Sequence, residues 1–109
     1  MLEPLLGSKN AERVLMFVAV REEGYARDIA RYFVTDLYAI QKQLDKFETS
    51  GILASRLVGR TRIYVFNPRY PFINELKNLL SKAFTFYRQE EQDNLTMIRR
   101  RPRRRGKPL

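Results

Sequence analysis

The residues best suited to chemistry in this chain are its cations. The sequence has 21 Lys and Arg residues against 12 Asp and Glu, a net charge of +9. Seven of the cations lie in residues 99–109, which hold no acid, so residues 1–98 carry 14 basic and 12 acidic side chains. This asymmetry predicts a polyanionic partner, with nucleic acid ahead of an anionic membrane surface. The alternative is a solvated tail that only aids solubility.

The sequence lacks residues that metal binding and acid–base catalysis commonly use. The chain contains no histidine and no cysteine. Zinc and copper sites rely mainly on these ligands, and histidine is the commonest general base. The adjacent carboxylates Glu22-Glu23 and Glu90-Glu91 are typical of solvated helix ends. The sequence therefore predicts a protein that is not an enzyme and that holds no metal or cofactor.

Composition places the chain among folded domains outside the membrane. Its hydrophobic content of 44% is enough for one modest core. No run approaches the roughly 20 apolar residues of a membrane span, and the first residues lack the pattern of a signal peptide. We expect a cytoplasmic protein with no membrane partner. Residues 1–92 should form one domain, and residues 93–109 a basic tail that is disordered when free.

Helical spacing of apolar residues dominates the first half of the chain. Three helices are expected, over residues 9–22, 26–33 and 36–50. Ser8 can cap the first helix, which Gly24 would end. Thr35 or Asp36 can cap the third helix, and Gly51 would stop it.

The second half changes to an extended pattern and then returns to helix. Residues 52–58 and 61–66 are predicted strands joined by a two-residue turn, Gly59-Arg60. A long helix is expected from Pro71 to about Glu91. Two short helices with a tight turn are a helix-turn-helix candidate, and the hairpin after them is a wing. The predicted fold is mainly α with a small β-hairpin (α+β), a winged helix-turn-helix with a long C-terminal dimerisation helix.

The middle of the chain resembles the winged helix-turn-helix of ArsR-type transcriptional regulators over roughly residues 8–70. The residues that carry the resemblance are Asp28, Ile29, Ala30, Ile40, Leu44, Phe47, Glu48, Gly51, Ile52, Leu53, Arg56, Gly59, Arg60 and Tyr64. The resemblance implies a cytoplasmic, homodimeric repressor that binds operator DNA, dimerises through terminal helices and in many members responds to an inducer.

This chain departs from that family in two places. Metal-sensing members use cysteine or histidine, which are missing here, so metal sensing is not implied and no small-molecule inducer can be named. Val34 stands at the turn position where such motifs often carry glycine. Because a β-branched residue disfavours positive φ, we expect a turn of different shape.

The third helix presents a polar face opposite its apolar spacing. That face consists of Leu37, Tyr38, Gln41, Lys42 and Asp45. We expect it to enter the major groove of duplex DNA. Gln41 suits paired hydrogen bonds to an adenine edge, and Lys42 suits guanine or phosphate. Leu37 or Tyr38 suits a thymine methyl group. The alternative is an ordinary solvated helix face.

Further candidate DNA contacts lie on the wing and at the start of the second helix. Arg56, Arg60 and Arg62 should hold phosphates or reach a narrow minor groove. The alternative is a charged hairpin whose cations discourage edge pairing. Tyr25 and Arg27 are expected to contact the DNA backbone.

The last predicted helix is apolar around most of its circumference, which calls for burial on more than one side. A second subunit would supply one side, and twofold symmetry is the commonest solution. The expected dimer-interface residues are Leu5, Ile73, Leu76, Leu80, Ala83, Phe84 and Tyr87. The alternative is a monomer whose last helix lies wholly in its own core.

Together these features predict a sequence-specific DNA-binding transcriptional regulator. It would be a dimeric repressor, with the helix over residues 36–50 in the major groove and the wing over residues 52–67 on the backbone or minor groove. The alternatives are a nonspecific or architectural nucleic-acid binder and a winged-helix protein-interaction adaptor. An RNA-binding role is also compatible with the basic tail.

Overall fold

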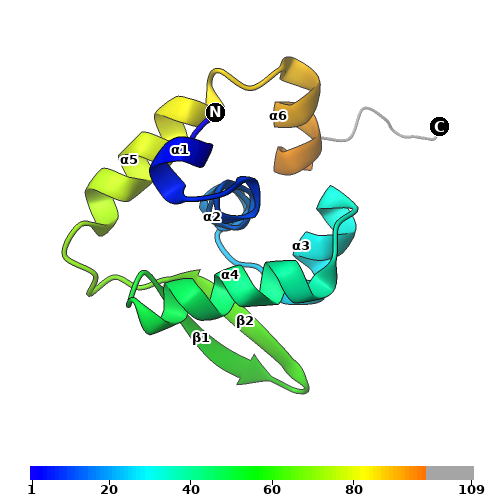
Figure 1. The fold of residues 1–109 in the computed structure, drawn as a ribbon, viewed down its shortest axis with the longest axis vertical. Coiled ribbons are helices and arrows are strands. Elements are labelled where there is room, and N and C mark those ends of the chain that lie inside the picture. Colours follow the sequence, from blue (N-terminus) through cyan, green and yellow to red (C-terminus); the bar gives the residue numbers. More distant parts are fainter. Residues whose placement is uncertain (98–109) are drawn as a thin grey trace.

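The computed structural model describes residues 1–97, and within that range it contains six helices and one two-stranded sheet (Figure 1). In chain order the elements are α1 (Glu3–Leu6), α2 (Lys9–Arg21), α3 (Ala26–Phe33), α4 (Leu37–Thr49), β1 (Leu53–Val58), β2 (Thr61–Phe66), α5 (Ile73–Phe84) and α6 (Gln89–Thr96). None of these helices is long and apolar enough to cross a membrane. The basic stretch over residues 99–109 lies outside the described residues.

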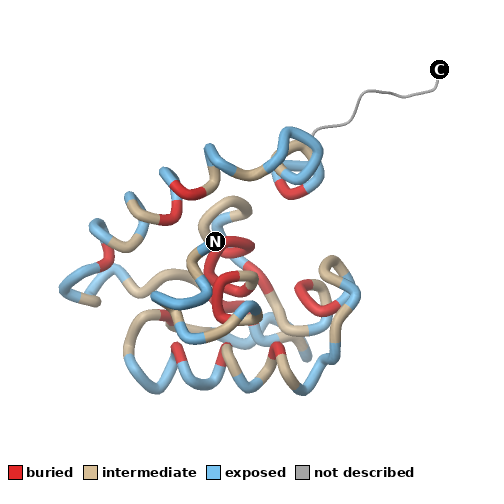
Figure 2. The backbone as a smooth tube through the Cα atoms, turned by 45° about the horizontal axis from the view of Figure 1, so that its top comes forward, coloured by how far each residue is buried: buried red, intermediate tan, exposed pale blue. Residues whose placement is uncertain are grey.

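Helix α2 is the centre of the fold. Its amino terminus is capped as predicted, because Ser8 Oγ accepts a hydrogen bond of 3.0 Å from the backbone N–H of Ala11. Its buried apolar residues are Ala11, Val14, Leu15, Met16, Phe17 and Val18. Helices α1, α5 and α6 cover it on one side, and α3, α4 and the hairpin on the other (Figure 1). Figure 2 shows buried positions clustering along α2 and on the side of α4 that faces it.

The end of α2 differs from the prediction that Gly24 stops it. The helix ends at Arg21, and Glu22 takes the left-handed conformation with φ of 72°. Gly24 instead pairs with β2, exchanging backbone hydrogen bonds of 3.0 and 2.8 Å with Tyr64. A Cβ at Gly24 would lie 3.0 Å from the ring of Phe17, so glycine is needed for this close approach.

Helices α3 and α4 form the predicted helix-turn-helix. Asp36 Oδ2 accepts a hydrogen bond of 3.0 Å from the N–H of Ala39 and so caps α4. The expectation that Val34 reshapes the turn is wrong. Val34 adopts φ of 50° and ψ of 55°, the left-handed conformation that glycine would take. The turn is closed by a 2.9 Å hydrogen bond from Thr35 N–H to Ala30 O, which overrides the preference of valine.

The hairpin follows α4 as the wing. Strands β1 and β2 pair antiparallel, from Leu53 opposite Phe66 to Val58 opposite Thr61. Gly59 has φ of 65°, as the predicted tight turn requires. The order of helix, turn, helix and hairpin confirms the predicted winged helix-turn-helix of mixed α and β structure.

The single C-terminal helix predicted from Pro71 to Glu91 is divided in two. Residues 85–88 separate α5 from α6 in tight turns, with hydrogen bonds of 3.0 Å from Phe86 N–H to Ala83 O and 3.1 Å from Tyr87 N–H to Phe84 O. The break lets α6 fold back onto α2, where Leu95 is buried. The domain end predicted at residue 92 therefore falls inside α6.

A buried carboxylate ties this break to the amino terminus. Glu12 on α2 is only 6% exposed, and it accepts hydrogen bonds of 2.5 Å from the Tyr87 hydroxyl and 2.6 Å from the backbone N–H of Leu2. Burial raises the pKa of Glu12, but these hydrogen bonds, together with the amino-terminal ammonium of Met1 at 3.3 Å, lower it by more, so the pKa lies below the ordinary 4.5. Glu12 is therefore charged at neutral pH and joins three segments of the chain.

Replacing Val34 with glycine should stabilise the fold. The side chain is 91% exposed and loses no packing, while glycine removes the strain of a β-branched residue at positive φ. Glycine also adds entropy to the unfolded chain, which offsets part of this gain. We therefore expect the free energy of unfolding, measured with urea, to rise by roughly 0.5–1 kcal/mol. Val34→Ala keeps a Cβ and should gain less. A Val34→Gly protein no more stable than wild type would contradict this view of the turn.

Removing the Tyr87 hydroxyl should make the stability of the fold change less as the pH falls. Tyr87→Phe leaves the Glu12 carboxylate short of a donor and should cost about 1–3 kcal/mol at pH 7. The folded-state pKa of Glu12 is depressed, so its contribution is full above the unfolded pKa and is lost as pH falls through the folded value.

The difference in the free energy of unfolding between the wild type and Tyr87→Phe should therefore narrow below pH 4.5. Tyr70→Phe is the matched control, because the Tyr70 hydroxyl makes no hydrogen bond within residues 1–97. A gap that stays constant from pH 7 to pH 3 would show that Glu12 does not carry the effect.

Candidate nucleic-acid interface

A groove of about 490 Å³ lies between the amino-terminal ends of α3 and α4 and the tip of the wing. Its lining residues are Tyr25, Ala26, Arg27, Leu37, Gln41, Arg60, Thr61, Arg62 and Tyr64. Six of the nine predicted DNA contacts are among them: Tyr25, Arg27, Leu37, Gln41, Arg60 and Arg62. No described residue that lines this groove is acidic.

The groove gathers arginines without a carboxylate partner. Arg27, Arg60 and Arg62 form no ion pair with any residue from 1 to 97. Several arginines outside the groove do have a carboxylate partner, as Arg56 has Glu23 at 4.0 Å. Unpaired cations around a concave surface concentrate positive potential there, which favours an anionic partner.

The start of α3 adds backbone donors to the same groove. Tyr25 is the residue that precedes the helix, and its side chain makes no capping hydrogen bond. The first N–H groups of α3 are thus left without a side-chain acceptor, next to the cation of Arg27. A helix amino terminus of this kind suits a phosphate group.

Gln41 is held from two sides. Its side-chain Nε2 donates to Asp45 Oδ1 at 2.9 Å and to the Tyr64 hydroxyl at 3.1 Å. Tyr64 is only 2% exposed, and burial raises the pKa of its hydroxyl, so it remains protonated and neutral. Tyr64 is a site residue that the sequence did not reveal, since alternation along β2 predicts packing but not a partner 23 residues away.

A second chain of hydrogen bonds ties the wing to α4. Arg62 Nη1 donates to Ser55 Oγ at 2.9 Å, and Ser55 Oγ donates to Glu48 Oε2 at 2.5 Å. Arg62 is thereby oriented along the face of the wing that meets α4. Neither Ser55 nor Glu48 was predicted as a site residue, because their contact depends on the hairpin register.

The remaining predicted contacts lie outside the groove. Tyr38 and Lys42 are exposed on the outer face of α4. Arg56 stands opposite Ile63, one residue out of phase with the Ser55–Tyr64 pair, so it lies on the other face of the hairpin. The structure does not bring Arg56 together with Arg60 and Arg62.

The predicted dimer-interface residues have two different environments. Ile73, Leu80 and Ala83 are buried in the core of their own chain, because α5 packs on α2. In the single chain these three side chains therefore leave little surface for a partner, and their place in a dimer interface stays a prediction. Leu76, Phe84 and Tyr87 are partly buried against the same core.

Three apolar side chains, those of Met1, Leu5 and Phe86, remain exposed at the end of the molecule away from the wing. Leu5 on α1 is 66% exposed, and Phe86 between α5 and α6 is 67% exposed. Figure 1 shows α1 and the link from α5 to α6 close together at this end.

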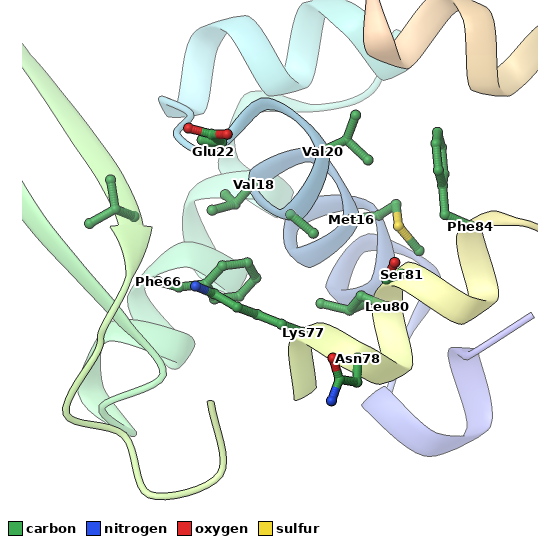
Figure 3. Close-up of a pocket in the computed structure, with 12 residues that line it drawn as sticks. Met16, Val18, Val20, Glu22, Phe66, Lys77, Asn78, Leu80, Ser81 and Phe84 are labelled. Atoms are coloured by element: carbon green, nitrogen blue, oxygen red, sulfur yellow. The ribbon is translucent and has the colours of Figure 1, made fainter. Parts of the chain in front are cut away.

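A second hollow, of about 660 Å³, lies between α2, β2 and α5 (Figure 3). Met16, Val18 and Leu80 give it an apolar wall, and Lys77 extends past Phe66 with its Nζ 5.8 Å from the ring centroid. No group of three potential metal ligands of the His, Cys, Asp or Glu type is found anywhere in residues 1–97.

No family model matches the chain, and no curated protein matches it. Among solved structures, a double-substituted variant of Lactococcus lactis ZitR in the apo form is similar, with 14% identity, a TM-score of 0.54, and coverage of 82% of this chain and 76% of that one. BldR from Sulfolobus solfataricus, a transcriptional regulator, has 19% identity and a TM-score of 0.52 over 89% of this chain and 77% of its own. These likenesses support the winged-helix fold.

Proposed function

We propose that this chain is a sequence-specific DNA-binding transcriptional regulator that acts as a dimeric repressor. The observation that carries the proposal is the groove between α3, α4 and the wing, where Arg27, Arg60 and Arg62 gather without carboxylate partners. The resemblance to ArsR-type regulators and the fold shared with BldR, a transcriptional regulator, support the same function.

The arrangement suggests how each element meets DNA. Helix α4 enters the major groove with Tyr38, Gln41 and Lys42 toward the bases. Arg60 and Arg62 on the wing bind phosphates or the adjacent minor groove, where arginine is attracted to a narrow A·T tract. The start of α3 contacts the backbone and fixes the register of the helix on the duplex.

The proposed dimer forms at the end of the molecule opposite the wing. Leu5 and Phe86 are the two most exposed apolar side chains there, and a self-complementary contact would bury both. The partly buried Leu76, Phe84 and Tyr87 would add to this contact through the surface that their own core leaves free. Two recognition helices would then face successive half-sites of a roughly palindromic operator.

The proposed basic tail is confined to residues 99–109, because residues 93–96 belong to α6. Its arginines would neutralise phosphates and add affinity more than specificity, because phosphate contacts carry no sequence information.

The decisive measurement is selection of binding sites from random duplexes, followed by titration at several salt concentrations. The wild-type chain should prefer a defined duplex over random DNA. Arg60→Ala with Arg62→Ala should weaken binding and lower the magnitude of the log–log salt slope by about 1.8, since each phosphate contact contributes about 0.9. Arg56→Ala is the matched control and should leave the slope nearly unchanged, because Arg56 lies on the other face of the wing.

Equal affinity for all duplexes would overturn the proposal in favour of an architectural binder. A chain truncated after Ile98 tests whether residues 99–109 alone produce that behaviour. If Arg60→Ala with Arg62→Ala instead lost binding to a protein partner and did not change DNA binding, the chain would be an adaptor.

The oligomeric state gives an independent prediction. The wild-type chain should sediment as a dimer, and Leu5→Gln with Phe86→Gln should weaken the dimer at least tenfold without changing its circular dichroism. Phe72→Gln is the control, an equally exposed aromatic residue at the other end of α5. A wild-type chain that remains monomeric at concentrations that saturate its operator would refute the dimer.

A further inference from the structure

Both N–H groups of the Gln41 side chain are already in use within the protein. A primary amide has two such donors, and in Gln41 one is directed at Asp45 Oδ1 and the other at the Tyr64 hydroxyl. The amide oxygen Oε1 has no hydrogen-bond partner within residues 1–97. Because Gln41 lines the groove, the group it can offer to a ligand is an acceptor.

The orientation of this amide is fixed by charge. Asp45 lies four residues along α4, on the same helix face, and its carboxylate only accepts hydrogen bonds. Turning the amide over would bring Oε1 against Asp45 Oδ1, acceptor to acceptor, in place of a bond of 2.9 Å.

Tyr64 holds the amide from the other side. Its ring is buried, and its backbone is fixed by two hydrogen bonds to Gly24. The amide is thus clamped between the recognition helix and the wing.

The major groove presents few donors to such an acceptor. Adenine N6 and cytosine N4 are amino groups, whereas guanine O6 and N7 and thymine O4 are acceptors that would repel Oε1. Paired recognition of adenine also needs an amide N–H directed at N7, and Gln41 has none left.

Given the proposed function, we infer that Gln41 is a clamped acceptor that selects a base whose exocyclic amino group lies in the major groove, adenine or cytosine, with little preference between them. Tyr64 and Asp45 are positioning residues in this inference. They act on base choice through the amide of Gln41 and do not themselves touch DNA.

The test is a competition assay with duplexes that differ at one base pair per half-site. Gln41→Met keeps the length of the side chain but removes the acceptor, and should abolish the preference at one base pair only. Tyr64→Phe frees one N–H of Gln41, so adenine should become favoured over cytosine at that pair by roughly tenfold. A merely structural role for Tyr64 would lower affinity for all duplexes alike.

A pair of charge-matched variants provides the second arm. Asp45→Asn removes the carboxylate that orients the amide and should relax the discrimination against guanine and thymine at the same pair. Glu75→Gln removes an exposed carboxylate on α5 that forms no ion pair or side-chain hydrogen bond within residues 1–97, so it should leave that preference unchanged. Each substitution removes one negative charge. The comparison therefore separates the orientation of the Gln41 amide from a general change in electrostatics.

The outcomes distinguish this inference from the proposed function. A base preference that survives Gln41→Met at every position would overturn the inference alone. So would a strong wild-type preference for adenine over cytosine that Tyr64→Phe does not change. A chain with no base preference at all would overturn both.

Discussion

The rest of the structure depends on the burial of α2 around most of its circumference. Each of its fully buried large side chains, such as Phe17 and Leu15, contributes about 1.5–3 kcal/mol by leaving water. The apolar faces of the helix-turn-helix and of α5 both pack against α2. The winged half and the C-terminal half therefore share a single core, so the groove and the opposite end of the molecule are held in a fixed relation.

The candidate interface depends on a second constraint, the attachment of the wing to α4. Tyr64 contributes backbone bonds to Gly24 and its hydroxyl to Gln41, while Ser55 joins Arg62 to Glu48. A two-stranded hairpin alone is marginally stable in water, so these contacts are what keep its tip beside the start of α4. The unpaired arginines of the groove are thus presented by a braced scaffold.

Sequence patterns predicted those features of the fold that depend on residues close together in the sequence. The caps at Ser8 and Asp36 and the turn at Gly59 depend on neighbours a few residues away, and all three are confirmed. Predictions were wrong where distant residues decide: the α5–α6 break is accompanied by a hydroxyl that reaches a carboxylate 75 residues away. The pairing of Gln41 with Tyr64 likewise depends on a hairpin register that periodicity alone does not give.

In the proposed interface with DNA, rigidity and base recognition depend on the same atoms. A free glutamine on a helix surface would lose about 1.5–2 kcal/mol of rotamer entropy when it binds a base, and a glutamine already clamped avoids much of that loss. The clamp, however, occupies both of the N–H donors that paired recognition of adenine would draw on. Because Tyr64 stabilises the wing and also sets what Gln41 can donate, substitutions that loosen the wing should alter base choice as well as stability.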